Sequence, residues 1–171
     1  FTGHAAVITI DSHGKTRMYE YGRYDKPDEK GVVRRVSVPD VVMKDGKPTD
    51  ASMKNLLGAV AKSEKNYQGT IDGAYFKTSD KQTQDINNYA AGRESQNSDP
   101  NRTPYNTGVV GDANNCATFA RDAVGAGGVD VSNAANDIRP TSTVSDLQKT
   151  ADETIDYNAK TKELKREEKP Q

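Results

Sequence analysis

Cys116 is the residue whose type and position most clearly permit chemistry. It is the single cysteine among 171 residues, and it follows Asn114 and Asn115, either of which can cap a helix. Unpaired backbone N–H groups and the positive end of the helix dipole favour a thiolate in a first turn. The position therefore suits a nucleophile. Cys116 also continues an apolar stripe with Phe119, and a cysteine on such a stripe is more often inert core.

The two histidines, His4 and His13, are the available imidazole bases. His4 heads an apolar, β-branched segment that would anchor it, and the adjacent Gly3 permits close approach of another element. His13 lies in an Asp-Ser-His-Gly sequence typical of a turn, where a solvated side chain is the simpler interpretation. The sequence therefore favours His4 as the partner of Cys116.

The elements that must position these residues start with strands and change to helices. Apolar and β-branched residues predict three strands, and from Asp50 the apolar residues recur at helical spacing. A further strand and a helix capped by Ser79 follow. In chain order, these elements are expected at residues 4–10, 17–21, 31–42, 50–68, 70–77 and 79–91.

The helix that begins near Cys116 has the clearest boundaries in the sequence. The preceding residues 94–112 are rich in Asn, Ser, Pro, Gly and Asp, which predicts a long loop of the kind that often carries function. The helix then ends at Gly125-Ala126-Gly127-Gly128. A long loop thus delivers the chain to the cysteine.

The C-terminal part has a weaker pattern. Leu147, Ala151, Ile155 and Ala159 suggest a helix with a thin apolar stripe, and interleaved Lys, Arg and Glu dominate residues 160–171. We expect a catalytic domain over residues 1–145, followed by a C-terminal helix and a charged, solvated tail over residues 146–171.

Composition excludes several classes of function. The net charge is −1, from 24 basic and 25 acidic residues, so no field attracts nucleic acid. No apolar run is long enough for a membrane span, and no classical signal segment opens the chain. One cysteine and two histidines cannot form a common zinc cluster, so neither a metal nor another cofactor is expected.

The order of these motifs resembles the circularly permuted NlpC-like (papain-like) cysteine hydrolases, in which the histidine-bearing strands precede the nucleophile helix. The resemblance spans residues 3–128. Its motifs are Gly3-His4-Ala5-Ala6-Val7, Tyr19-Glu20-Tyr21-Gly22-Arg23, the segment Phe76–Gln82, Tyr105-Asn106 and Asn114-Asn115-Cys116-Ala117-Thr118-Phe119-Ala120. It implies an α+β fold in which an antiparallel sheet packs against the helix bearing the cysteine.

The resemblance also implies a mechanism. The imidazole of His4 would accept the Cys116 proton, the thiolate would attack an acyl carbon, and the imidazolium would protonate the leaving amine. The Cys116 backbone N–H would supply one oxyanion donor, with Asn115 a second donor or simply the helix cap, and Tyr105 would border the substrate. Residues 108–112 form an insert that departs from the family pattern and bears on the choice of substrate.

A third polar residue from the second strand orients the imidazole in this family. Pairing around the turn would set Glu20 on the face of His4, so Glu20 is our candidate. A register slip of one residue would bring Tyr19 or Tyr21 there instead. A solvated strand carboxylate is the alternative interpretation of Glu20.

The leading hypothesis is a cysteine peptidase or amidase that cleaves peptidoglycan stem peptides. Some family members with this order resemble antibacterial effectors delivered by a type VI or related system. That resemblance implies export without a classical signal peptide, action in the periplasm of a target bacterium, a secretion-system carrier and a cognate immunity protein.

Three other functions remain open at this point. Permuted relatives act on lipid esters or isopeptide bonds, as acyltransferases or hydrolases, although this polar chain has no obvious docking segment. A non-catalytic binding domain would keep Cys116 as a protected core thiol. A glycosidase would need paired carboxylates, which are recognised by their separation in space.

Overall fold

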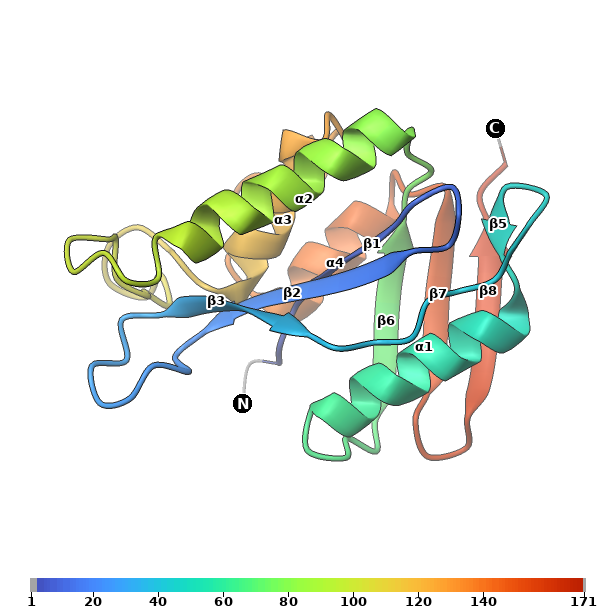
Figure 1. Ribbon diagram of the computed structural model, residues 1–171, viewed down its shortest axis with the longest axis horizontal. Coiled ribbons are helices and arrows are strands. Elements are labelled where there is room, and N and C mark those ends of the chain that lie inside the picture. The colour runs from blue at the N-terminus through green and yellow to red at the C-terminus, as the bar shows by residue number, and fades with distance from the viewer. Residues whose placement is uncertain (1–2, 171) are drawn as a thin grey trace.

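The first sheet is a hairpin extended by a third strand (Figure 1). The computed structural model describes residues 3–170. The antiparallel sheet contains, in spatial order, β1 (Val7–Ile10), β2 (Thr16–Gly22) and β3 (Val32–Val36). Val7 pairs with Tyr19, a register that places Glu20 on the face expected for it. Even-numbered residues of β1 and β2 therefore share one face.

The third strand is shorter than predicted. It was expected over residues 31–42, but β3 ends at Val36, and the chain passes Pro39 to reach the small hairpin of β4 (Met43–Lys44) and β5 (Lys47–Pro48). A proline has no N–H for a strand ladder, which explains the early end.

Four α-helices lie within residues 3–170. They are α1 (Asp50–Ser63), α2 (Asp80–Ser95), α3 (Cys116–Ala126) and α4 (Pro140–Gln148), and a short 3₁₀ helix covers Ser132–Ala134. The side chains of Thr49, Ser79 and Asn115 cap the first three. Within the described residues, no helix has the length and apolar character that a membrane crossing requires.

A second antiparallel sheet corrects the prediction for the C-terminus. It comprises β6 (Thr70–Tyr75), β7 (Glu153–Asn158) and β8 (Glu163–Glu168), in that order. The predicted helix through Ile155 is wrong, because α4 ends at Gln148 and Ile155 lies in β7. Alternate residues of β7 are buried, which is the period of a strand.

The charged segment at residues 160–171 is likewise not a tail over the residues described. It provides the turn into β8 and the edge strand itself. Alternating charged side chains are suited to an exposed sheet edge, where they discourage pairing with other chains. Residues 146–170 thus hold the end of α4 and a β-hairpin, where a helix and a solvated end were expected over residues 146–171.

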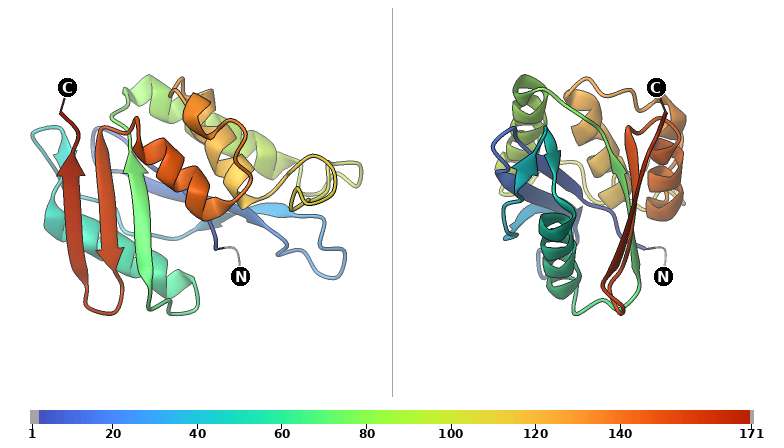
Figure 2. Two further views of the ribbon diagram at one scale, coloured as in Figure 1. Left: turned by 180° about the vertical axis from the view of Figure 1, so that it is seen from behind. Right: turned by 90° about the vertical axis from the view of Figure 1, so that its right-hand side faces the viewer.

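Helices cover both sheets, and the buried side chains gather in two clusters. One cluster joins β1 and β2 to α2 and α3, and it includes Cys116 and Phe119. The other joins the opposite face of the first sheet to α1 and β7, through Met18, Leu57 and Ile155. Figure 2 shows α1 lying along the second sheet and α4 beside β6. The α+β class is confirmed, with antiparallel sheets packed against helices.

Candidate active site

Cys116 begins α3, as predicted, and its side chain is 6% exposed. The Asn115 side-chain oxygen accepts hydrogen bonds from the backbone N–H groups of Ala117 (2.9 Å) and Thr118 (3.0 Å). The Cys116 N–H has no acceptor among the described residues. The Asn115 side chain therefore binds the N–H groups of the two residues after Cys116 and leaves the Cys116 N–H available to an incoming oxygen atom.

His4 lies just ahead of β1 and meets both Cys116 and Glu20. Its Nε2 is 2.5 Å from Oε2 of Glu20, and its side chain is 28% exposed. Burial opposes protonation, but hydrogen bonds and charge interactions with Cys116 and Glu20 outweigh burial and raise the pKa of His4 to about 10. Because Glu20 occupies Nε2, Nδ1 is the nitrogen left for the sulfur. The structure thus brings together the two residues that the sequence placed far apart.

Glu20 is fully buried and holds two cationic partners. It accepts hydrogen bonds from His4 and from the guanidinium of Arg34, which comes from the neighbouring strand β3. Burial acts to raise the pKa of Glu20, but these partners prevail and lower it to about 2. The carboxylate is therefore ionised at neutral pH and fixes the orientation of the imidazole ring.

Tyr19 and Tyr21, the alternatives to Glu20, point to the opposite face of the hairpin. Both are buried in the cluster with α2 and α3. The Tyr21 hydroxyl accepts a hydrogen bond from the Asn114 amide at 3.1 Å. The strand register thus selects Glu20 as the neighbour of His4.

Glu64 joins the site without having been predicted. It caps the C-terminal end of α1, and its Oε1 is buried, has no hydrogen-bond partner among the described residues and lies 3.9 Å from Nε2 of His4. Burial and the neighbouring Glu20 carboxylate raise the pKa of Glu64 to about 7. No local pattern marks this residue, because only the packing of α1 under the first sheet brings it there.

His4, Glu20 and Glu64 are also the residues that could hold a metal ion. One ligand atom from each lies within 4.8 Å of the others. The Arg34 guanidinium already binds Glu20 and adds positive charge beside the cluster. That charge opposes a further cation, so the arrangement fits an imidazole–carboxylate pair better than a metal centre.

Asn115 and Tyr105 have different surroundings from each other. The Asn115 amide donates to the carbonyl oxygens of Ile138 (2.9 Å) and Thr107 (3.3 Å), so the whole side chain is used in capping and loop contacts. This favours the interpretation of Asn115 as a cap over that of an oxyanion donor. Tyr105 stacks on Tyr21 at a ring distance of 5.6 Å. Burial and then the charge of Cys116 raise the pKa of Tyr105, which is consistent with a position near the sulfur.

The insert at residues 108–112 forms a closed loop beside the site. Asn106 and Asn114 pair across its base through two backbone hydrogen bonds of 2.9 and 2.8 Å. Val109 and Val110 are 85% and 82% exposed at its tip. The loop therefore projects outward from the isolated bridge between Asn106 and Asn114, just before Cys116. His13 lies in the exposed turn between β1 and β2, as predicted.

Comparison with known proteins gives the family. Residues 1–131 match the model of the type VI secretion system effector TseH-like family. The chain belongs to this family of type VI effectors. No curated protein matches the sequence. Among solved structures, the crystal structure of the type VI secretion system effector TseH is similar, with a TM-score of 0.83 and 32% sequence identity. The match covers 97% of this chain and 88% of that one.

Proposed function

We propose that this effector is a cysteine hydrolase with a permuted papain-like fold, and that it cleaves amide bonds in peptidoglycan stem peptides. The observation that carries the proposal is the line of contacts from Cys116 at a helix start, through His4, to the buried Glu20 carboxylate. A nucleophile, a base and a group that orients the base are the elements of covalent acyl transfer.

The first half of the reaction uses each of these groups once. In the resting pair, His4 already holds the thiol proton on Nδ1, and the Cys116 thiolate attacks the carbonyl carbon of the scissile amide. The free backbone N–H of Cys116 donates to the oxyanion that forms. The imidazolium then gives its proton to the leaving nitrogen, so an amine departs and a thioester on Cys116 remains.

Water completes the cycle. His4, now neutral, removes a proton from a water molecule, and the hydroxide attacks the thioester carbon. The carbon–sulfur bond breaks, the product leaves as a carboxylic acid, and the proton on His4 accompanies the regenerated thiolate. Glu20 keeps the ring oriented through both halves and stabilises its charged form.

Membership of the type VI effector family bears on where the protein acts and on which kind of substrate. A type VI effector acts in a cell other than its producer, which favours an essential structure of that cell as substrate. We infer action in the periplasm of a target bacterium, transport by a secretion-system carrier, and protection of the producer by a cognate immunity protein that blocks the site.

The proposal predicts that Cys116→Ala and His4→Ala each abolish cleavage of purified sacculi, because one loses the nucleophile and the other the base. Mass spectrometry of the released muropeptides measures the reaction and identifies the bond. His13→Ala is the matched control, since His13 is the other histidine and lies in an exposed turn. Cleavage by Cys116→Ala at the wild-type rate would refute covalent catalysis.

Alkylation with iodoacetamide tests the non-catalytic alternative. A thiolate paired with His4 should react in the folded state well below pH 8, and faster than in His4→Ala. A thiol that reacts only after unfolding would identify Cys116 as core, and the chain as a binding domain.

A further inference from the structure

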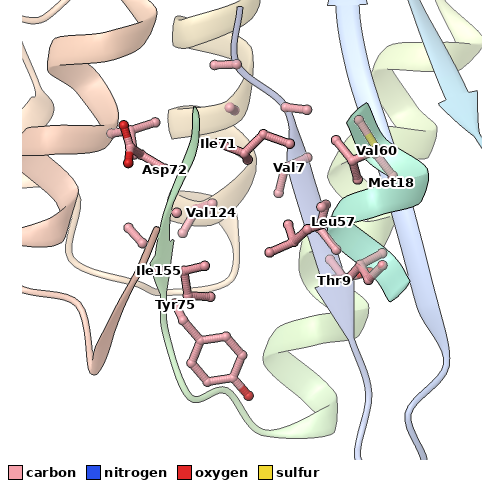
Figure 3. A pocket seen from close by; sticks show the side chains of 18 of the residues that line it. Val7, Thr9, Met18, Leu57, Val60, Ile71, Asp72, Tyr75, Val124 and Ile155 are labelled. Carbon is pink, nitrogen blue, oxygen red and sulfur yellow. The ribbon is translucent and has the colours of Figure 1, made fainter. Parts of the chain in front are cut away.

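A large cavity lies between the two sheets, and two residues of the candidate active site, His4 and Glu64, are among the residues that line it. Its volume is about 1240 Å³, which exceeds the roughly 300–1,000 Å³ typical of ligand sites. Its wall comes from β1, β2, α1, β6 and β7, together with residues of α3 and α4 (Figure 3). His4 lines the cavity but Cys116 does not.

The wall of the cavity is mostly apolar. Met18, Leu57, Val60 and Ile155 are buried residues of the second hydrophobic cluster, and Ile71 packs against them. Figure 3 shows these side chains around one space, with β1 and α1 on one side and β6 on the other. Such a wall offers few partners to polar groups, so a peptide with its many amides would lose more hydrogen bonds than it gained.

Charged side chains of both signs line the cavity. The cations include Arg23 and Lys65, and the carboxylates include Glu64 and Asp72. Neither cation forms an ion pair with a carboxylate among residues 3–170, whereas the nearby Lys26 is paired with Glu29. Arg23 is held over the Tyr105 ring at 4.6 Å. Two uncompensated cations therefore border an apolar interior.

We propose that the cavity binds one unbranched alkyl chain with an anionic head group, such as a fatty acid. The chain would occupy the space between Leu57, Ile71 and Ile155, and the carboxylate would face Arg23 and Lys65. Apolar burial drives the binding, and the cationic end selects the sign of the head group. This inference does not require the proposed hydrolase activity, although His4 and Glu64 line the same cavity.

Calorimetric titration of the full chain with sodium dodecanoate, below its micelle concentration, tests the proposal. We expect saturable binding of one molecule per chain, with affinity rising up to about fourfold per methylene from octanoate to dodecanoate. Dodecyltrimethylammonium has the same chain and the opposite charge, so it should bind at least tenfold more weakly. Absence of saturable dodecanoate binding, or equal binding of both ligands, would overturn the proposal.

Substitutions locate the site. Ile71→Trp should narrow the part of the cavity beside Leu57 and Ile155, where the alkyl chain is proposed to lie, and weaken dodecanoate binding at least tenfold. Val42→Trp is the matched control, because Val42 is 62% exposed and lies outside the cavity wall, and it should bind as the wild type does. The chain has no native tryptophan, so the fluorescence of the introduced indole also reports occupancy. Equal affinities in the two variants would place the ligand elsewhere.

Lys65→Glu keeps the test informative if Ile71→Trp does not fold. Lys65 is exposed, so its substitution leaves the core intact. We expect dodecanoate to bind several-fold more weakly to Lys65→Glu and dodecyltrimethylammonium to bind more tightly. An unchanged preference between the two ligands would contradict the assignment of the cationic end. Circular dichroism of each variant establishes that it is folded.

Discussion

At the residue scale, the site is an arrangement of charges in which each group sets the state of the next. Arg34 and His4 keep Glu20 ionised, and Glu20 with Cys116 keeps His4 protonated. Glu64 is the one member of the group whose buried oxygen has no hydrogen-bond partner among the described residues, and its proton is retained to about pH 7. The site therefore favours the charged form of His4 and disfavours the charged form of Glu64.

The protonation of His4 predicts a clear pH dependence. The folded-state pKa of about 10 exceeds the ordinary value of 6.5, so its contribution to stability is complete below pH 6.5 and is lost as the pH rises to 10. Nuclear magnetic resonance of the His4 ring should show titration near pH 10, and Cys116→Ala should lower that pKa. His13→Ala removes the second histidine signal. A His4 ring that titrates near pH 6.5 would contradict the ion pair.

The raised pKa of Glu64 predicts how removal of its carboxylate changes stability with pH. Its pKa is raised from 4.5 to about 7, so the protonated form adds stability below pH 4.5 that is lost as the pH rises through 7. Glu64→Gln should therefore be more stable than the wild type at pH 8 and similar at pH 4, as measured by urea unfolding. Glu167→Gln, on an exposed edge-strand carboxylate, is the control and should change little at either pH.

At the element scale, the N-terminus of α3 determines where the sulfur lies. Asn115 caps the helix with its oxygen and holds the carbonyl groups of Thr107 and Ile138 with its nitrogen. One side chain therefore joins the helix start to the preceding loop and to the segment before α4. These hydrogen bonds of Asn115 position Cys116 as much as the packing of its own side chain does.

The cap predicts a difference between two otherwise similar substitutions. Asn115→Ala removes four hydrogen bonds and should cost about 1–2 kcal/mol of the free energy of unfolding, with a large loss of sacculus cleavage. Ser79→Ala removes the cap of α2, which should lower stability by about 1 kcal/mol and leave the cleavage rate near wild type. Urea unfolding and the cleavage assay measure both. Equal activity losses would show that the cap at Asn115 has no special role.

At the scale of the whole molecule, polar contacts of Arg166 join the C-terminal hairpin to β5 and to the start of α1. Arg166 of β8 pairs with the buried Glu153 of β7 and donates to the Pro48 carbonyl oxygen at 2.7 Å. It also pairs with Asp50 at the start of α1. The C-terminal hairpin is thereby fastened to the helix that carries Glu64 to the site.

These contacts of Arg166 predict that the charged C-terminal segment contributes to the stability of the fold. Arg166→Ala should destabilise the chain by about 3–5 kcal/mol, because it leaves Glu153 buried without its partner. Lys165→Ala changes an exposed cation on the neighbouring position of the same strand and should cost less than about 0.5 kcal/mol. Chemical unfolding distinguishes them, and similar small losses would support a loosely attached hairpin.

The sequence alone determined the local parts of this protein: the first hairpin, the start and end of the cysteine helix, and Glu20 as the leading candidate beside Tyr19 and Tyr21. These depend on residues close together in the chain, through turn chemistry, strand alternation and helix capping. The tertiary structure decided the rest. A thin apolar stripe around Ile155 is compatible with a helix or a strand, and only pairing with β6, which lies far earlier in the chain, selects the strand. Glu64 and the cavity exist because α1 and the second sheet pack against the first, and such long-range contacts leave no spacing pattern in the sequence.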